Sequence, residues 1–163
     1  MVLSLDPSST VIGFAVFGDG DHLIDGGLIE PQCKSAESYW RIRSMASDLA
    51  GLLDQIRPAV ILIEWTKGKV GVRRHGGLGA GLAVYGAGIG SVAAQCEAWA
   101  AQRDCRVVPV LENTWTRGVT KAARQAAIAA SVDGYDSAKD PGGDVADAIG
   151  LGQWWMKETL VRS

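Results

Sequence analysis

The sequence predicts an α/β domain in which five strands and four helices follow one another in the order βββ-α-β-α-β-α-α. Short apolar runs separated by turn residues crowd residues 1–30 and indicate strands. Two later apolar runs, 59–65 and 105–111, are separated by a segment of helical length. A length of 163 residues favours one domain, so we expect residues 1–163 to fold as a single unit.

The first three strands are expected to form an antiparallel meander. Residues 1–6 and 11–17 are apolar runs joined by the small polar turn Pro-Ser-Ser-Thr at 7–10. A Gly-Asp-Gly turn then leads to residues 21–30, a third segment of strand character. Strands this close in sequence and joined by tight turns pair antiparallel with their neighbours.

Residues 35–58 have the periodicity of a helix. Ser35 is the expected N-cap, with Ser38 as the alternative, and Pro58 ends the segment. The apolar side chains recur at spacings of three and four residues and would form the buried face: Tyr39, Ile42, Met45, Ala46, Leu49, Leu52, Leu53 and Ile56.

The segment that follows combines a buried strand with a basic loop. Residues 59–65 read AVILIEW, a continuous apolar run that is typical of a central strand covered on both faces. Residues 66–77 then form a Gly-rich loop, and its basic side chains are Lys67, Lys69, Arg73, Arg74 and His75.

A long helix is expected over residues 78–103. Its stretch from Leu78 to Cys96 has no charged residue and is long enough to cross a bilayer. Glycines and alanines keep its hydrophobicity modest, however, and it lies between two predicted strands. We therefore expect no membrane span but a buried helix, with a Gly/Ala face that a second copy of the chain can cover.

The remaining chain alternates loops with shorter elements. Residues 105–111 form the fifth strand, and the loop ENTWTRGV at 112–119 leads to a helix that begins near Thr120. A polar loop at 133–143 precedes the last helix, which covers 144–158.

Charge and cysteine content limit the classes of function. The net charge of −2 and pI of about 5.6 argue against a general nucleic-acid coat protein but allow a local basic surface. The N-terminus lacks the basic residues of a secretory signal, and Asp6 interrupts its apolar stretch. The three cysteines have no CxxC spacing, so we expect free thiols in the reducing cytoplasm.

Four acids are placed where they can converge on one site. Asp6 and Glu64 each end a buried strand, and strands that lie side by side would present both acids to one cleft. Asp144 and Asp147 are three residues apart in the first turn of the last helix, so they share a face. Each could singly be a turn or helix-terminal acid. Glu64 within VILIEW, however, carries a large desolvation cost unless it is paired or bound to a metal.

Oxygen ligands without a histidine or cysteine cluster suit Mg²⁺ or Mn²⁺. Two such ions at a phosphodiester would activate water and stabilise the leaving oxygen. The sequence therefore predicts a candidate metal site that is built from Asp6, Glu64, Asp144 and Asp147.

These motifs resemble a known family. LSLDPSSTVIGFAVF, VILIEW, the Gly-rich helix after it and GGDVADAIGLG together resemble the RuvC-type Holliday junction resolvases of the ribonuclease H-like superfamily, in order over residues 2–155. The resemblance implies a five-stranded mixed sheet flanked by helices, a homodimer, and Mg²⁺-dependent cutting of junctions in DNA recombination and repair. The four acids match the family's metal ligands, with Asp144 either a ligand or a residue that orients water.

The resemblance also suggests a cellular setting. The short, divergent chain is more similar to phage-encoded members than to the bacterial housekeeping enzyme. The implied place of action is the cytoplasm of a bacterial or phage-infected cell.

Several side chains are candidates for contact with DNA. Lys67, Lys69, Arg73 and Arg74 follow Glu64 and would reach phosphates, although a solvated basic loop is the alternative. Lys121 lies beside the expected cap Thr120, and Arg117 and Arg124 are near it. A helix N-terminus with adjacent cations binds phosphate readily. The family has a lysine in this region, assigned to the scissile phosphate or the transition state, and the resemblance assigns that role to Lys121.

A few other residues keep two interpretations. Trp65 and Trp115 could each stack on an unpaired base or pack within the protein. Glu112, Asp133 and Asp140 are expected to be caps or turn residues.

Three alternative functions share the expected fold. A broader nuclease would cut branched DNA or RNA–DNA hybrids without junction specificity. An ATP-binding protein of the sugar-kinase or actin type would need a second domain and a phosphate loop, and 163 residues supply one domain. A non-catalytic DNA-binding module is disfavoured because all four acids are present. The two-fold symmetry of a junction favours a symmetric dimer.

Overall fold

The structure is a computed structural model that describes residues 1–163 except 20, 34–36, 67–77 and 161–163. For residues 78–83 and 160 it describes the backbone but not the side chains. Its centre is one mixed sheet with the strand order β3-β2-β1-β4-β5. β1 pairs antiparallel with β2, as β2 does with β3, whereas β1, β4 and β5 run parallel. The predicted mixed sheet with three antiparallel strands is confirmed, and its strands are β1 (Val2–Pro7), β2 (Ile12–Phe17), β3 (Leu23–Ile29), β4 (Val60–Trp65) and β5 (Arg106–Leu111).

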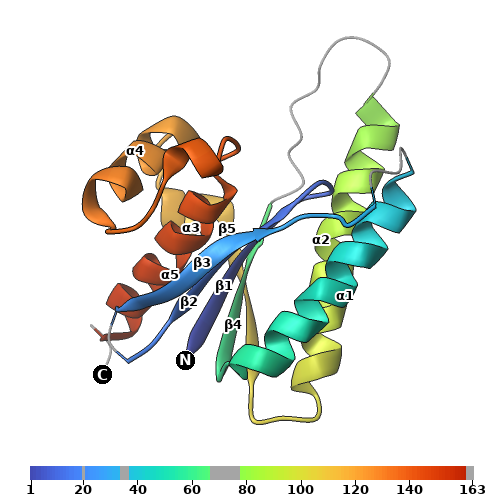
Figure 1. Cartoon of the computed structure of the whole chain (residues 1–163), viewed down its shortest axis with the longest axis horizontal. Coiled ribbons are helices and arrows are strands. Elements are labelled where there is room, and N and C mark those ends of the chain that lie inside the picture. The colour runs from blue at the N-terminus through green and yellow to red at the C-terminus, as the bar shows by residue number, and fades with distance from the viewer. Residues whose placement is uncertain (20, 34–36, 67–77, 161–163) are drawn as a thin grey trace.

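Helices cover both faces of the sheet (Figure 1). One face carries α1 (Ser38–Ile56) and α2 (Leu78–Ala100), which pack against each other. The other face carries α5 (Asp144–Leu160), with α4 (Lys121–Ser131) packed on it. Two short elements complete the fold, namely α3 (Glu112–Thr116) and the 3-10 turn η1 (Ser137–Lys139).

Several predicted boundaries differ from the structure. α1 begins at Ser38 with Glu37 as its N-cap, so neither predicted serine caps it. The helix ends at Ile56 because Arg57 adopts a left-handed conformation and donates its N–H to Leu53 O. The predicted Thr120 cap of α4 is confirmed, since its hydroxyl accepts a hydrogen bond from the Ala123 amide at 3.3 Å.

The predicted loop 112–119 was partly wrong because it contains α3. The turn of helix forms where the chain leaves β5 and buries Trp115 under the sheet edge. Burial of this aromatic ring favours an ordered turn over a polar loop. The polar loop 133–143 likewise contains η1, whose N-cap Asp136 accepts from the Ala138 amide.

Side-chain alternation along β1 determines which face receives each residue. Leu3 and Leu5 belong to the core cluster beneath α1 and α2. Ser4 points to the opposite face, where its hydroxyl donates a 2.6 Å hydrogen bond to Ala148 O in α5. Asp6 is two residues beyond Ser4, so it lies on the same face, towards α5.

The Gly/Ala face of α2 is only partly available to another chain. A Cβ on Gly88 would lie 2.9 Å from the Ser8 carbonyl oxygen, so this glycine serves the packing of α2 on the β1–β2 turn. Gly86 and Gly90 have open space around them. The predicted dimer surface can therefore include Gly86, whereas Gly88 belongs to the fold itself.

Two further expectations concern the cysteines and the membrane. Cys33, Cys96 and Cys105 are free, as predicted. Among the helices in the described part of the chain, none combines the length and apolar character that a bilayer span needs.

Candidate active site

Asp6 and Glu64 lie side by side at the carboxyl ends of two parallel strands. β1 and β4 pair with Leu5 opposite Ile63, the residues that directly precede the two acids. Both carboxylates are nearly buried, with 8% of Asp6 and 7% of Glu64 exposed. The structure thus brings together two acids that are 58 positions apart in the chain (64 − 6).

The start of α5 places the other two acids over the same point. Gly13 is the partner of Asp6 on β2, and a Cβ on Gly13 would overlap the backbone carbonyl of Asp144. Glycine is therefore required for α5 to begin directly against the sheet. Asp144 and Asp147 belong to the first turn of this helix, and Asp147 is only 2% exposed.

Lys121 lies among these acids. Its ammonium nitrogen is 2.7 Å from Asp144 Oδ1, 3.3 Å from Asp147 Oδ2 and 3.5 Å from Asp6 Oδ2. The residue is the first of α4, and the packing of α4 on α5 brings it to the site. One ammonium group thus contacts three carboxylates from two different elements.

Arg124 holds Asp147 in a two-pronged ion pair. Its Nε donates to Asp147 Oδ1 at 2.7 Å and its Nη2 donates to Oδ2 at 2.8 Å. Its Nη1 donates to Val119 O, and its guanidinium lies 5.0 Å from the centre of the Trp115 ring. Such bidentate pairs fix the orientation of a carboxylate as well as neutralising it.

Trp115 is part of the protein core and positions Glu64. Its indole N–H donates a 2.8 Å hydrogen bond to Glu64 Oε2. Its buried ring packs with Leu62, Val110 and Leu151. Of the two interpretations, packing applies to this tryptophan and stacking on a base does not. Trp65 is 38% exposed at the end of β4.

The acids raise one another's affinity for protons. Burial, followed by the charge of Glu64, raises the pKa of Asp6 well above its ordinary value. Burial, followed by the charges of Asp147 and Glu112, raises the pKa of Glu64 to about 7. The Lys121 ammonium is desolvated, which lowers its pKa, but the hydrogen bond to Asp144 and the charges of Asp6 and Asp147 outweigh this and raise it. The site therefore has more negative charge than its two cations offset.

The chemistry of these groups fits a hard divalent cation. All four candidate ligands are carboxylates, which are the ligands that Mg²⁺ and Mn²⁺ prefer. Within the residues that the structure describes, no three acidic, histidine or cysteine side chains stand ready to surround a metal ion. Lys121 and Arg124 are paired with the acids instead, so a metal ion bound by these acids would take the place of the Lys121 ammonium.

The predicted DNA-contacting residues divide into three groups. Lys121 and Arg124 line the cavity above the acids, which has a volume of about 480 Å³. Arg117 is exposed, has a left-handed backbone, and pairs with Glu158 of α5 at 3.3 Å. The loop cations Lys67, Lys69, Arg73, Arg74 and His75 lie outside the described residues.

Three residues at this cavity were not foreseen as part of a site. Glu112 directly follows β5, whose parallel pairing sets Val110 opposite Glu64, and Glu112 lines the same cavity as Glu64. The rule that predicted Asp6 and Glu64, an acid at the end of a buried strand, also applies to it. Tyr85 and Thr66 line the cavity as well, and the Tyr85 hydroxyl is hydrogen-bonded to Thr66. The docking of α2 that brings Tyr85 here has no local signal in the sequence.

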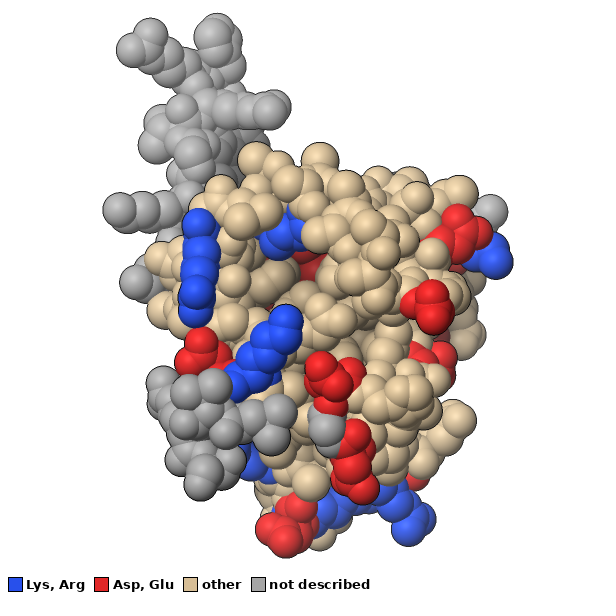
Figure 2. Space-filling model, turned by 90° about the vertical axis from the view of Figure 1, so that its left-hand side faces the viewer, with Lys and Arg blue, Asp and Glu red and all other residues tan. Residues whose placement is uncertain are grey.

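The charges on this side of the molecule are interspersed. Figure 2 looks onto the left-hand side of Figure 1 and shows a hollow with acidic atoms in its depth and basic side chains around it. Cations at the rim can attract a phosphate even though the acids lie deeper in the hollow.

Solved structures share this architecture over almost the whole chain. RuvC of T. thermophilus in complex with a Holliday junction substrate matches with a TM-score of 0.67 and 14% identity, covering 99% of this chain and 96% of that one. The fold is that of RuvC-type resolvases. The fowlpox virus resolvase in complex with Holliday junction DNA matches this chain with a TM-score of 0.60 and 14% identity, covering 97% of this chain and 99% of that one.

A third solved structure that this chain matches comes from yeast. The mitochondrial Holliday junction resolvase Ydc2 matches with a TM-score of 0.57 and 18% identity, covering 95% of this chain and 77% of that one. No protein-family model and no curated protein matches the sequence. The RuvC-type, ribonuclease H-like fold that the motifs predicted is thus confirmed by structure.

Proposed function

We propose that this protein is a Mg²⁺-dependent endonuclease that resolves Holliday junctions by nicking two strands symmetrically. The observation that carries the proposal is the convergence of Asp6, Glu64, Asp144 and Asp147 with Lys121 at one edge of a RuvC-type sheet. The acids come from three elements that are far apart in sequence, which a set of unrelated cap and turn residues would not explain.

Each side chain has a distinct role in this proposal. Asp6, Glu64 and Asp147 bind the metal, with Mn²⁺ able to replace Mg²⁺, and Asp144 either joins them or orients the attacking water. Two bound ions would supply an activated water and stabilise the leaving oxygen. Trp115 holds Glu64 and Arg124 holds Asp147, so both carboxylates keep a fixed orientation.

Lys121 changes partner in the proposed reaction. Without bound metal its ammonium contacts three of the acids. With a metal held by those acids, the ammonium would be free to face the phosphate at the mouth of the cavity. There it stabilises the negative charge that grows on the phosphoryl oxygens in the transition state.

The DNA is proposed to lie across the hollow at this edge of the sheet. Lys67, Lys69, Arg73, Arg74 and Arg117 are proposed to contact phosphates and to orient the duplex arms without reading sequence. A junction has two strands to cut, so a symmetric homodimer would present one site to each. Trp65, partly exposed beside the site, can stack on an unpaired base at the branch point.

The test is cleavage of a labelled four-way junction with Mg²⁺, beside linear duplex, a fork and an RNA–DNA hybrid, for wild type and Asp6→Asn. Paired nicks in the junction alone, absent in the variant, support the proposal. Cutting of every branched substrate, or of the hybrid, would replace it with a broader nuclease. No metal-dependent cutting of any substrate would refute nuclease function, and ATP binding would be tested next.

A further inference from the structure

Asp140 is a buried acid outside the candidate active site. It is 2% exposed and lies in the segment between α4 and α5. Its Oδ1 accepts a 3.2 Å hydrogen bond from the Val145 amide and its Oδ2 a 2.9 Å bond from the Ala146 amide. Its Oδ2 also accepts from the Tyr135 hydroxyl at 2.8 Å. The carboxylate thus holds the first turn of α5 and is held in turn by Tyr135.

The backbone of Asp140 forms a hydrogen bond to α4, while its side chain binds the first turn of α5. Its carbonyl oxygen accepts a 2.6 Å hydrogen bond from Gln125 Nε2 and a 3.0 Å bond from the Gly143 amide. Gln125 directly follows Arg124, and Val145 directly follows Asp144. Asp140 therefore connects the helix that carries the cations to the helix that carries two of the acids.

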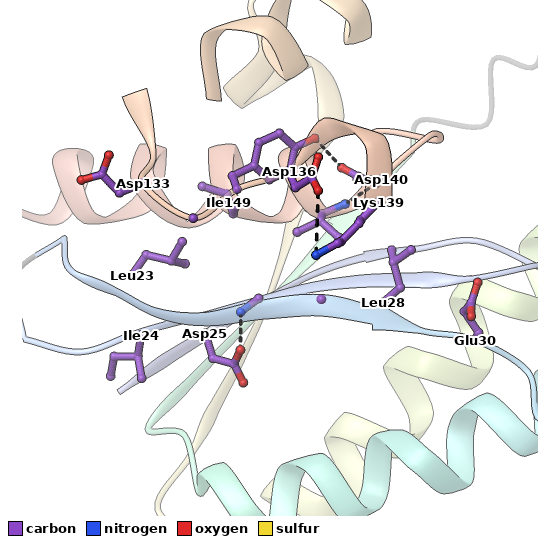
Figure 3. A pocket seen from close by; sticks show the side chains of 15 residues that line it. Leu23, Ile24, Asp25, Leu28, Glu30, Asp133, Asp136, Lys139, Asp140 and Ile149 are labelled. Carbon is purple, nitrogen blue, oxygen red and sulfur yellow. Dashed lines mark hydrogen bonds and ion pairs between the residues drawn. The ribbon is translucent and has the colours of Figure 1, made fainter. Parts of the chain in front are cut away.

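Packing alone does not hold this corner of the molecule. A cavity of about 500 Å³ lies between β3 and residues 133–140, and Asp140 is one of its lining residues (Figure 3). Gly26 of β3 faces Val145 of α5, so at this position the strand contributes no side chain to the packing. Hydrogen bonds to Asp140 consequently carry a larger share of the connection between α4 and α5.

We propose that Asp140, oriented by the Tyr135 hydroxyl, is a positioning residue that sets the spacing between α4 and α5. That spacing determines how Lys121 and Arg124 meet Asp144 and Asp147. The consequence for metal binding rests on the proposed function, whereas the connection between the helices does not. Residues that orient metal ligands from outside the coordination sphere commonly change metal affinity about tenfold or more when they are replaced.

The test compares Asp140→Asn and Tyr135→Phe with Asp136→Asn. The control removes an equal charge four residues away, where Asp136 caps η1 and has no bond to α5 among those described. Three quantities are measured: amide hydrogen exchange at Val145 and Ala146, Mn²⁺ affinity of the free protein by calorimetry, and the rate of junction cleavage. Tyr135→Phe retains both amide bonds to Asp140, so it serves if Asp140→Asn does not fold.

We expect Asp140→Asn to accelerate exchange at Val145 and Ala146 and to weaken Mn²⁺ binding about tenfold. Tyr135→Phe should give a smaller change in the same direction, and Asp136→Asn none. Unchanged exchange in Asp140→Asn, or faster exchange with wild-type Mn²⁺ affinity, would overturn the inference. If Asp140→Asn does not fold, a Tyr135→Phe protein with wild-type exchange and Mn²⁺ affinity would overturn it as well. If the wild type neither binds Mn²⁺ nor cuts a junction, the proposed function fails, and the exchange data alone then support or overturn the connection between the helices.

Discussion

The positive charge of Lys121 stabilises the folded protein as well as having a proposed role in the reaction. It contacts Asp6, Asp144 and Asp147, two of which are almost fully buried. A carboxylate in such a place is costly to ionise unless a cation lies beside it. In the proposed function a metal would compete with this lysine for the same oxygens, and this competition can be measured.

Replacing Lys121 with Met keeps most of the apolar stem and removes the charge. We expect the metal-free protein to lose about 1–2 kcal/mol of stability, a buried-pair cost discounted because Lys121 is partly exposed. Mn²⁺ affinity should stay the same or increase, while junction cleavage slows about 100-fold. Denaturant unfolding with EDTA, calorimetry and single-turnover cleavage check these three effects.

Lys139→Met is the matched control, since Lys139 is exposed in η1 and contacts Asp136 instead of the site acids. It should change none of the three quantities. Weaker Mn²⁺ binding by Lys121→Met, together with unchanged stability of the metal-free protein, would contradict the competition.

Glu64 makes the metal-free protein sensitive to pH. Burial and the neighbouring acids raise its pKa from an ordinary 4.5 to about 7. Between these values the folded chain holds a proton that the unfolded chain has released, so stability falls as pH rises through this window and stays low above it. Glu64→Gln cannot ionise, and its amide oxygen can still accept from Trp115.

We therefore expect Glu64→Gln to unfold at a higher temperature than wild type at pH 8 in EDTA, and the difference to shrink towards pH 5. Thermal unfolding across this pH range measures the effect. Glu97→Gln, an exposed replacement on α2, should show no such trend. A variant that is less stable than wild type at pH 8 would contradict the raised pKa.

α5 reaches the sheet only because β2 has a glycine at the point of contact. A Cβ on Gly13 would overlap the Asp144 carbonyl and lie 2.9 Å from the Val145 amide nitrogen. Gly13→Ala should therefore push the first turn of α5 outward, destabilise the protein by about 1–3 kcal/mol and abolish cleavage. Denaturant unfolding and the junction assay measure these effects.

Gly51→Ala tests whether the loss at Gly13 is specific to that contact. Gly51 lies within α1 with nothing within 4 Å of a Cβ, so alanine there should stabilise by about 0.5–1 kcal/mol. Equal stability of Gly13→Ala and wild type would show that α5 does not depend on this approach.

The elements that sequence patterns predicted well are those with a local periodic signal. The strands that carry Asp6 and Glu64 were predicted from apolar runs. Because adjacent parallel strands end at the same edge of the sheet, the two acids were also expected to lie close together. α3 was missed because its polar residues have no periodic signal, and the burial of Trp115 depends on contacts with residues from other elements. Tertiary packing brings Asp144 against Gly13 and lets the Asp140 carbonyl accept a hydrogen bond from Gln125 of α4. Residue spacing along the chain does not predict either contact.

In the molecule as a whole, the larger apolar core and the candidate site lie on opposite faces of the sheet. α1 and α2 cover one face of the sheet (Figure 1). The four acids and two cations gather on the opposite face, at the carboxyl ends of the parallel strands. Gly86 of α2 has open space around it, so the helix surface there is the part of the predicted dimer face that can be tested.

If Gly86 lies in a dimer interface, Gly86→Leu should convert the proposed dimer to monomer without unfolding it. Gly88→Leu should instead destabilise each chain, because Gly88 packs against Ser8 and Ser9. Light scattering and thermal unfolding separate the two effects. A Gly86→Leu protein that keeps the mass of the wild-type dimer would exclude this surface, and a monomeric wild type would refute the dimer.

The most direct test of the proposed site is anomalous diffraction from crystals of the protein soaked in Mn²⁺. We predict anomalous density bounded by Asp6, Glu64, Asp144 and Asp147, with the Lys121 ammonium displaced from the carboxylates it contacts without metal. Crystals that show no manganese among these acids, with Lys121 unmoved, at a concentration that supports junction cleavage would contradict it.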